Sequence, residues 1–528
     1  MPQSQPAGGH SLWEPLRQPI FRMLWTAQFV SDIGTWAQTV GAQWFLVSAS
    51  GSAALVALVQ TATSLPIVLL ALPAGVVADL VDRRRLLIFW QSALFVIAAV
   101  LCVAALTGWL TPLGLLSATF LIGVGVAAST PAWQSVQPDV VSLELLPTAT
   151  TLSSASINIG RSAGPAIGGL VVALAGPGWT FGLNAVSYLA VVTALVRWRT
   201  LRPREVGRER FGAAIRTGVN HVRHSPPVRR IVLRAAMWTF PGSAVWALLP
   251  ILCYRQLHLG SAGYGIVLAS LGIGAIIGAF VLAPLRHRIP INRLLAGAGV
   301  VFSVVIVGVS LIRVLWVVLV LMTVAGACWI ATLSTVNAAA VITLPRWVRA
   351  RGLGVLWVAL QGGTALGAVV WGTLAQHTSA PSAFIAAAVG TLLATATLGR
   401  WGLARPIAPQ LGVPIPWLSP QWAGKPQQLE GPVDVMIKYS VLPGEVESFT
   451  FALRGTRSSR LRGGANRWSV GARDDDPAAF VEHYRMASVR DVEQLNGVRL
   501  SVQDAELLTG LASLCQAPPL MTCTVWPD

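Results

Sequence analysis

Long apolar segments alternate with short polar ones over the first four hundred residues of the chain. A helix needs about 20 mostly apolar residues to cross the hydrocarbon layer of a bilayer, and twelve of these segments are long enough. They lie near residues 20–48, 54–79, 86–108, 113–138, 149–175, 179–197, 230–254, 262–284, 292–312, 314–341, 350–375 and 381–403. We predict helices because unpaired backbone groups are costly in lipid and the alternation of a membrane barrel is absent.

Positive charges distinguish the two sides of this predicted membrane region. Arginines gather in alternate connections, near residues 17–22, 83–85, 197–230, 286–293, 346–351 and 400–405. The other connections carry little beyond Arg255 and Arg313. Because basic residues are enriched in cytoplasmic loops, we expect a multi-pass inner-membrane protein with both termini in the cytoplasm. An even number of spans predicts the same arrangement.

The two halves of the membrane region carry a repeat. A polar connection, residues 198–229, separates a half formed by 1–197 from a half formed by 230–405. Residues of the first half recur about 203 positions later: Gly75 as Gly278, Arg83 as Arg286, Arg85 as Arg288, Gln134 as Asn337, Gly160 as Gly363, Gly164 as Gly367 and Gly169 as Gly372. This constant register predicts two six-helix bundles related by a pseudo-two-fold axis along the membrane normal.

The composition changes after residue 405. Residues 406–431 are rich in proline, which favours a semi-extended linker. The remaining residues, 432–528, are more polar. Their patterns predict strands at 433–441 and 467–472 and helices at 444–461, 478–484 and 502–515. We therefore expect a small cytoplasmic α+β domain after an all-α membrane domain.

Composition and charge narrow the function. Hydrophobic residues make up 54% of the chain and charged residues 11%, compared with about 25% charged residues in soluble domains. The net charge of +17 lies in short segments between apolar runs, so we expect contact with the lipid bilayer and no binding of nucleic acid. The five cysteines have no metal-ligand spacing, so we expect no disulfide framework, metal site or cofactor.

The cytoplasmic end of the second predicted span carries the most specific motif, Gly75-x-x-x-Asp79-x-x-Asp82-Arg83-Arg84-Arg85. The glycine would let two helices approach closely, and Asp79 would accept hydrogen bonds from an arginine or a helix N-terminus. We predict that the motif gates the cytoplasmic side. Asp139 and Glu144 are candidates to pair with its arginines when that side closes. An arginine cluster that serves only membrane topology is the alternative.

Two ionisable residues, Asp32 and Arg161, fall well inside predicted spans. A charge at mid-membrane costs about 2.5–3.5 kcal/mol on insertion scales, so such residues usually face a cavity or a partner. We predict that Asp32 carries a proton and that Arg161 attracts an anionic substrate, with Asn158 as a further cavity residue. A purely structural ion pair between Asp32 and Arg161 stays open.

The fifth predicted span is rich in helix-breaking and small residues. Pro165 removes a backbone donor and favours a kink, and four glycines give a thin face for a close helix contact: Gly160, Gly164, Gly168 and Gly169. We predict a hinge here. Four tryptophans, Trp36, Trp44, Trp133 and Trp357, are candidates to line a cavity for a ring-containing substrate.

These motifs resemble a known family. The Gly75 motif resembles the signature loop of the major facilitator superfamily, Gly-x-x-x-Asp-Arg/Lys-x-Gly-Arg-Arg. Its own form, with the segments 31–36 and 158–169, is more like the enterobactin-exporter-type branch, often called transmembrane secretion effectors. The resemblance covers about residues 15–405 and implies efflux of a siderophore-like compound or amphiphilic drug by alternating access. The segment 164–169 is similar to the antiporter motif of proton-coupled exporters, which implies the proton as coupling ion.

The tail has a resemblance of its own. Segments 462–468 and 477–482 are similar to antibiotic-biosynthesis monooxygenases, which implies a ferredoxin-like fold and dimerisation. Where that family continues with Trp and His, this chain has Val489 and Val492, so we expect a regulatory or dimerising domain and not an enzyme. Three alternatives stay open: an uptake symporter, a membrane-tethered enzyme that uses the tail, and a sensor that binds ligand without transport.

Overall fold

The computed structural model describes residue 11 and residues 13–142, 144–198, 211–404, 410, 412–422, 431–473, 476–496 and 499–525. They fall into two compact units. The first comprises the described residues of Met1–Val206, Arg234–Val336 and Trp357–Gly402. The second comprises those of Gly207–Leu233, Asn337–Leu356 and Leu403–Asp528.

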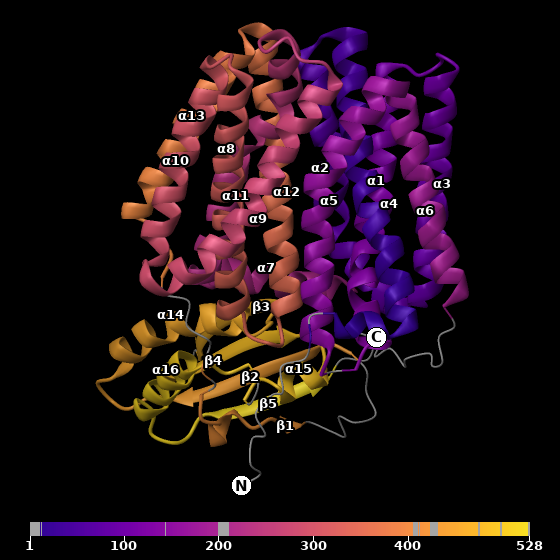
Figure 1. Ribbon diagram of the computed structural model, residues 1–528. Helices are drawn as coiled ribbons and strands as arrows, with labels where there is room; N and C mark the ends of the chain where they lie inside the picture. Colours follow the sequence, from indigo (N-terminus) through magenta and orange to yellow (C-terminus); the bar gives the residue numbers. More distant parts are fainter. Residues whose placement is uncertain are drawn as a thin grey trace. The chain divides into compact units, whose positions relative to one another are not determined.

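Twelve long helices account for the predicted membrane region (Figure 1). They are α1 (Pro19–Ser50), α2 (Ala53–Leu80), α3 (Arg83–Leu106), α4 (Pro112–Val140), α5 (Leu146–Ala175), α6 (Pro177–Arg197), α8 (Pro226–Arg255), α9 (Ser261–Arg288), α10 (Ile291–Leu311), α11 (Leu315–Thr343), α12 (Arg349–His377) and α13 (Ala380–Ala396). Among the described residues, eleven helices are long and apolar enough to cross a membrane. They confirm eleven of the predicted spans, and α1 stays a predicted twelfth.

Polar residues explain why α1 is less apolar than the eleven helices that are apolar enough to cross a membrane. Gln38 lies buried in this helix and accepts a hydrogen bond of 2.7 Å from Asn184 of α6. The Asn184 side chain in turn accepts a hydrogen bond from Ser187. A buried amide that is paired in this way avoids the cost of an unsatisfied polar group, so α1 tolerates polar residues through its partner helix.

Short polar caps set where the helices begin. Ser52, Thr111 and Ser379 accept hydrogen bonds from the first turns of α2, α4 and α13. Helix α1 ends at Gly51, whose φ of +59° is a left-handed conformation that glycine adopts without strain. These caps allow connections of only a few residues, so consecutive helices run in opposite directions.

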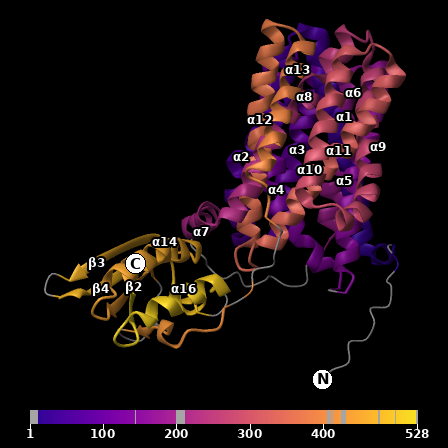
Figure 2. The same ribbon diagram turned by 90° about the vertical axis from the view of Figure 1, so that its left-hand side faces the viewer.

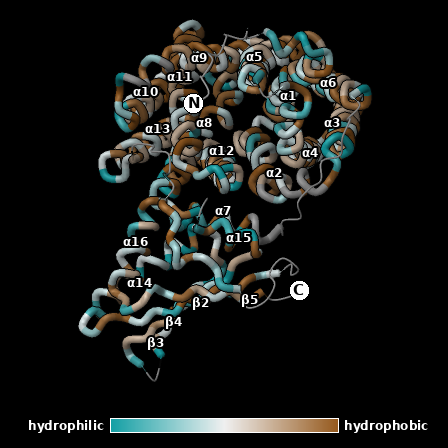
Figure 3. The backbone as a smooth tube through the Cα atoms, turned by 90° about the horizontal axis from the view of Figure 1, so that it is seen from below, coloured by the Kyte–Doolittle hydropathy of each residue, from teal (hydrophilic) through white to brown (hydrophobic). Residues whose placement is uncertain are grey.

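The two halves of the chain form similar helices. Pro112 and Val140 bound α4, and Leu315 and Thr343, each 203 residues later, bound α11. In Figure 3, α1–α6 lie on one side and α8–α13 on the other. We call these sets the first and the second group. One hydrophobic core contains residues of both groups, including Leu46, Val56, Leu248 and Val267.

The predicted polar connection contains a helix that the sequence reading missed, α7 (Phe211–His224). Thr217, His221 and Val222 lie on its buried side, whereas Arg223 is exposed. The segment has only one strongly buried aliphatic residue among its described side chains, so its hydrophobic period was too weak to predict it.

The tail forms a five-stranded sheet with two longer helices on one face (Figures 1 and 2). Its elements are β1 (Gln421–Trp422), β2 (Val433–Ser440), α14 (Val446–Arg462), β3 (Arg467–Arg473), β4 (Asp476–Met486), α15 (Val489–Glu493), α16 (Val502–Ser513) and β5 (Leu520–Val525). The strand order is β1-β5-β2-β4-β3, antiparallel except for the pair β1–β5. Phe449 and Leu453 of α14 and Leu508 of α16 share a core with Val435 of β2.

The predicted strands at 433–441 and 467–472 are confirmed, as are the helices at 444–461 and 502–515 within a few residues. The predicted helix at 478–484 is wrong, because these residues belong to β4. The buried positions of β4 alternate, but one of them is Glu482. A buried charge concealed the period of two in the sequence.

Glu482 is neutralised by its neighbours. Arg460, also buried, donates to both of its carboxylate oxygens at 3.1 and 3.2 Å, and Tyr439 and Trp468 donate at 2.7 and 2.8 Å. Burial alone raises the pKa of this carboxyl. The charge of Arg460 and the hydrogen bonds outweigh burial, so the pKa of Glu482 is lower than usual.

Glu482→Gln is expected to destabilise the tail by about 3–5 kcal/mol, because it leaves the Arg460 charge buried without its partner. The lowered pKa of Glu482 makes its contribution complete above the ordinary glutamate value near 4.5 and lost as the pH falls further. Hydrogen exchange of the β4 amides at pH 7 measures the effect. Glu493→Gln, at an exposed position, is the control and should leave exchange unchanged. Equal protection in both variants would contradict this role for the ion pair.

Candidate functional site

Two ends of the helical region can be distinguished by their connections. The connections after α1, α5 and α8 contain Gly51, Gly176 and Gln256, and we call this the Gly51 end. The opposite end carries Arg83–Arg85 at the start of α3, and we call it the Arg83 end. Because consecutive helices are antiparallel, six of the eleven connections gather at the Gly51 end and five at the Arg83 end (Figure 1).

The glycines of α5 form its contact with α1. A Cβ atom at Gly160 would lie 2.8 Å from the Cβ of Asp32, and one at Gly164 would lie 2.5 Å from the Cβ of Trp36. One at Gly168 would lie 2.6 Å from the Cα of Ala37. These distances are shorter than van der Waals contact, so the small residues permit the close helix crossing.

The second group repeats this crossing between α12 and α8. A Cβ at Gly363 would lie 2.3 Å from Oγ1 of Thr239, and one at Gly367 would lie 2.1 Å from the carbonyl oxygen of Phe240. Thr239 and Phe240 follow Trp36 and Ala37 by 203 positions. Gly363 thus meets the counterparts of the residues that Gly164 meets, so the second group repeats the kind of contact but displaced by four residues, about one helical turn, from the sequence register.

A further pair of glycines joins the two groups. A Cβ at Gly169 of α5 would lie 2.5 Å from the carbonyl oxygen of Ser261 in α9. A Cβ at Gly372 of α12 would lie 2.4 Å from the Cβ of Ala57 in α2. Each half thus places a glycine against a helix of the other half.

The Asp32 carboxylate lies at this crossing with two neutral partners. It accepts a hydrogen bond of 2.7 Å from Ser156 Oγ of α5 and one of 2.8 Å from Gln28 Nε2. Neither partner was predicted. Ser156 was missed because nothing in the sequence alone shows that α5 packs on α1, although it lies one turn before Gly160.

Arg161 forms a hydrogen bond with Asn158 and no ion pair with Asp32 among the described residues. Its Nη2 donates to Asn158 Oδ1 at 2.9 Å, so the structure brings these two predicted residues together. Its Nε is buried without a hydrogen-bond partner. Among the described residues no ion pair joins Arg161 to Asp32. The structural ion pair left open by the sequence is thus not formed in this conformation.

The predicted tryptophans fall in three different environments. Trp36, one helical turn beyond Asp32, lies 5.7 Å from Trp246 of α8 between ring centroids. Trp44 stacks at 6.2 Å on Tyr264 of α9. Trp133 packs against an internal hydrophobic cluster of the first group, and Trp357 is 49% exposed. Trp36 and Trp44 thus connect the two groups.

Hydrogen bonds between the groups gather toward the Gly51 end. Tyr264 Oη donates to Gln43 Oε1 at 2.5 Å, and Gln43 Nε2 donates to the Trp246 carbonyl oxygen at 3.0 Å. Arg255 donates to the Gly51 carbonyl at 2.7 Å. Gln376 accepts from Ser52 and from the backbone of Ala53. We call Gln43, Tyr264 and the Trp246 carbonyl the Gln43 latch; no motif pointed to it.

At the Arg83 end, the charged motif holds the first group together. Asp82 caps α3 by accepting from the Arg85 amide at 2.8 Å. Arg83 donates to Asp139 at 3.2 Å and to the backbone of α4 at Ser135, so this pair joins two helices of the first group, and pairing on closure stays a prediction. Arg84 donates to the last carbonyls of α6, where a cation is favoured by the helix dipole.

Fewer contacts are described for the remaining residues of the Gly75 motif. The Asp79 side chain lies outside what the structure describes, although its backbone belongs to α2. A Cβ at Gly75 would meet no described atom within 4 Å, so the close contact at Gly75 stays a prediction. Glu144 and Arg85 are exposed.

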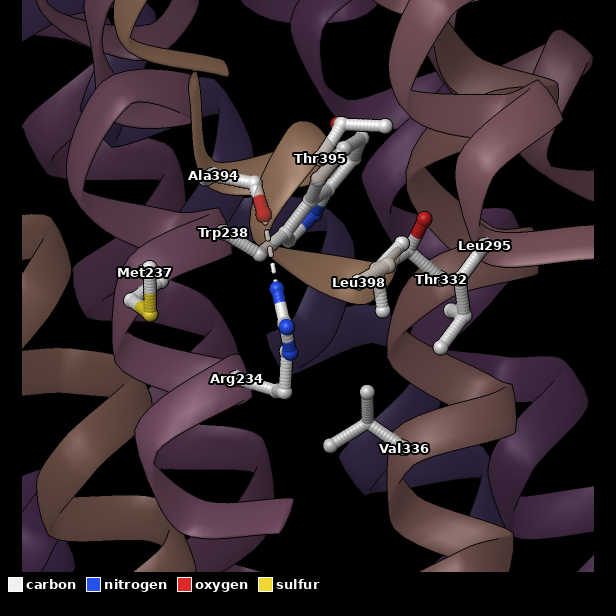
Figure 4. Close-up of a pocket in the computed structure, with 9 residues that line it drawn as sticks. All are labelled: Arg234, Met237, Trp238, Leu295, Thr332, Val336, Ala394, Thr395 and Leu398. Carbon is white, nitrogen blue, oxygen red and sulfur yellow. Dashed lines mark hydrogen bonds between the residues drawn. The ribbon is translucent and has the colours of Figure 1, made fainter. Parts of the chain in front are cut away.

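The second group contains a buried arginine that was not predicted from the sequence. Arg234 of α8 donates to the Ala394 carbonyl at 2.6 Å, to Thr397 Oγ1 at 2.7 Å and to the Trp401 carbonyl at 2.8 Å, which caps the end of α13. It borders a cavity of about 30 Å³ (Figure 4). The lining residues are Arg234, Met237, Trp238, Leu295, Thr332, Val336, Ala394, Thr395 and Leu398. A volume of this size holds about one or two waters, so it is not a substrate chamber.

The described residues contain no group of three or more His, Cys, Asp or Glu side chains suited to a metal ion. All five cysteines are free.

Sequence comparisons identify related transporters. The staphyloferrin A transporter of Staphylococcus aureus (strain NCTC 8325 / PS 47) is 27% identical over 293 residues, 54% of this chain and 73% of that protein. The enterobactin exporter EntS of Shigella boydii serotype 4 is 28% identical over 273 residues, 51% of this chain and 64% of that protein. EntS of Escherichia coli O1:K1 / APEC is 27% identical over 275 residues, 51% of this chain and 65% of that protein. The match thus spans less than two thirds of the two EntS proteins and about three quarters of the staphyloferrin A transporter.

Solved structures share the fold. A bacterial homolog of the human lysosomal transporter Spinster, inward-facing and unoccupied, superposes with a TM-score of 0.57 at 17% identity, over 75% of this chain and 96% of that one. The nucleoside transporter NupG superposes with a TM-score of 0.59 at 12% identity, over 73% of this chain and 100% of that one.

The sequence profile of transmembrane secretion effectors matches residues 10–519, nearly the whole chain including most of the tail. Proteins of this kind and the named relatives are transporters of the major facilitator type and not enzymes. The chain therefore belongs to the transmembrane secretion effector family of the major facilitator superfamily.

Proposed function

We propose that this protein is a proton-coupled exporter of a small organic compound, either siderophore-like or an amphiphilic drug. The observation that carries the proposal is the doubled glycine crossing, in which α5 packs on α1 and α9 as α12 packs on α8 and α2. Two equivalent halves that meet through small residues can rock against each other around a shared site. The names of the siderophore transporters among its relatives support outward movement and this substrate class.

The proposed topology has twelve spans, with α1 as the first, and two six-helix bundles formed by 1–197 and 230–405. Arg83, Arg84 and Arg85 at one end of the helices support a cytoplasmic Arg83 end, with both termini on that side of the inner membrane. Residues 198–229 are then the central cytoplasmic loop. Residues 406–431 are the linker, and 432–528 the cytoplasmic tail.

The proposed conformation is inward-facing. The Gln43 latch, the Arg255–Gly51 hydrogen bond and the contacts of Gly169 and Gly372 lie toward the Gly51 end, which is extracellular in this topology. The open space beside Gly75 at the opposite end fits a cytoplasmic side that has not closed. The Asp79 gate would act when it does.

Asp32 is the proposed proton carrier, near mid-membrane. Both of its hydrogen-bond partners are neutral, so a proton can bind the carboxylate without breaking an ion pair. Arg161, with a buried Nε that lacks a partner, is the proposed group for an anionic part of the substrate, and Asn158 orients it. Trp36 and Trp246 would close the site above Asp32.

The tail has the element order β2-α14-β3-β4-α16-β5 and the strand order β5-β2-β4-β3. This order supports the ferredoxin-like fold that the sequence resemblance implies. Its relation to the monooxygenases, and dimerisation through it, stay proposals.

Transport by the purified protein tests the proposal. In proteoliposomes loaded with buffer at low pH, an exporter oriented with its cytoplasmic side outward should accumulate a radiolabelled siderophore, and a proton ionophore should abolish the accumulation. In cells, deletion should raise the intracellular level of the compound. A lower level after deletion would instead indicate uptake.

Tyr264→Phe is expected to shift the resting equilibrium about fivefold toward the outward-open state, because it removes one hydrogen bond of the Gln43 latch and leaves Gln43 Oε1 buried without its donor. The distance between spin labels at Leu113 and Trp316, exposed residues of the two halves at the extracellular side, measures the shift. Tyr254→Phe, at a tyrosine that is 45% exposed, is the matched control. An unchanged distance distribution in Tyr264→Phe would rule out the latch.

A further inference from the structure

The second compact unit brings the tail together with helix α7, which lies between the two groups, and with the segment between α11 and α12. In that segment Trp347 lies under the guanidinium of Arg499, whose Cζ is 4.5 Å from the centre of the ring. The ring of His221 from α7 also meets Trp347, edge to face, at 5.6 Å. One side chain of the transporter therefore lies between residues of the tail and of α7.

Arg499 is held in position by its own domain. It donates to Asp491, to the Gly463 carbonyl at 3.0 Å and to Gln494 at 3.2 Å, and its side chain is 4% exposed. A guanidinium that is fixed and desolvated binds an aromatic face more strongly than one at an open surface. The tail thus presents a preformed site for Trp347.

Helix α7 is joined to the tail by directed hydrogen bonds. His221 Nδ1 lies 3.2 Å from the Arg462 carbonyl oxygen, and Asn220 donates to the Ala465 carbonyl at 3.4 Å. Arg462 in turn forms an ion pair with Asp504 of α16. Gly464, at φ +112°, lets the tail backbone pass close to Thr217. These contacts fix one register between α7 and the tail.

The same docking reaches the start of α12. A Cβ at Gly218 of α7 would lie 2.7 Å from the Cβ of Arg351, so α7 and α12 are also in close contact. Farther along, α12 meets α2 of the other half through Gly372 and through the hydrogen bond from Thr61 to the Ala365 carbonyl. The contacts between α12 and α2 must change when the two halves rock against each other.

We propose that the C-terminal domain is an intramolecular ligand of α7 and the α11–α12 connection, docked on Trp347, and that docking restrains the transport cycle. This inference rests on the proposed transport function. A ligand shifts a conformational equilibrium only by its differential affinity for the two states. Here the differential arises because α12 is held at the Trp347 end while its other end has to move relative to α2. Release of the tail speeds exchange between the states.

The test uses the full-length protein in lipid nanodiscs and proteoliposomes. Trp347→Ala and Arg499→Met remove docking from opposite sides, and the second leaves the membrane domain untouched. The matched controls are Trp109→Ala and Arg490→Met, at exposed positions. Docking is read from hydrogen exchange of the 215–224 amides. The restraint is read from turnover and from the label pair Leu113–Trp316.

Both docking variants should raise exchange of the 215–224 amides by roughly tenfold, the sign of local opening, and turnover by about fivefold. The controls should match the unmodified protein. Unchanged exchange of these amides in both docking variants would overturn docking. Raised exchange, together with unchanged or lower turnover and unchanged label distances, would overturn the restraint. If the unmodified protein moved no compound, the transport proposal would fail, whereas exchange and label distances would still decide this one.

Discussion

Asp32→Asn is expected to abolish proton-driven export while the protein stays inserted and folded. The amide keeps the shape of the side chain and its contacts with Ser156 and Gln28, but it cannot take up and release a proton. Loss of an essential proton-transfer group lowers turnover by roughly a hundredfold or more. Export driven by a pH gradient in proteoliposomes, with binding measured separately, gives the size of the effect.

Glu144→Gln serves as the control for this loss of one carboxylate, because Glu144 is exposed at the Arg83 end. Export by this variant should equal that of the unmodified protein. Asp32→Asn should keep downhill exchange of substrate across the membrane, since only the coupling is removed. Full pH-driven export by Asp32→Asn would exclude the residue from proton coupling.

Gly169→Val is expected to eliminate export by preventing closure of the Gly51 end, the proposed extracellular side. The new side chain would clash with the Ser261 carbonyl oxygen and the Gly265 Cα, which a Cβ would approach to 2.5 and 3.0 Å. Both are backbone atoms of α9, so no side chain can turn away, and overpacking of this kind costs about 1–3 kcal/mol or more. The protein should then accumulate outward-open, with loss of transport by more than about tenfold.

The equivalent position in the second half allows a rescue experiment. At Gly372 the nearest atom is the Cβ of Ala57, a side chain that can be removed. Gly372→Ala should impair export, and adding Ala57→Gly should restore part of it. Gly297→Val, where a Cβ would meet no described atom within 4 Å, controls for the change in helix propensity. Normal export by Gly169→Val would mean that α5 and α9 do not close on each other.

The sequence predicted those features that depend on runs and registers of residues. Eleven apolar spans and the resemblance to secretion effectors are confirmed by the helices and the family comparison. The register of 203 residues holds for the bounds of α4 and α11 but not for the Arg83 motif, because Arg83 begins α3 whereas Arg288 ends α9. The thin face of the fifth span could be predicted because glycines at helical spacing have few other uses in a membrane helix.

Features that depend on which helices become neighbours could not be predicted. Asp32 and Arg161 looked like partners because both are charged and near mid-span, but α5 turns Ser156 toward Asp32 and Arg161 toward Asn158. The Gln43 latch consists of ordinary residues that acquire a role only where α1, α8 and α9 meet. In the tail, Glu482 concealed a strand because its charge is paired inside the core.

Two spin-label distances measured on one protein test most directly whether two equivalent halves alternate around a central site. One label pair is Leu113 with Trp316 and the other is Arg85 with Arg288, each related by the repeat of 203 residues and placed at opposite ends of the helices. On changing pH and adding substrate, the first distance should lengthen as the second shortens. Two distances that stay fixed, or that lengthen and shorten together, would contradict alternating access in this protein.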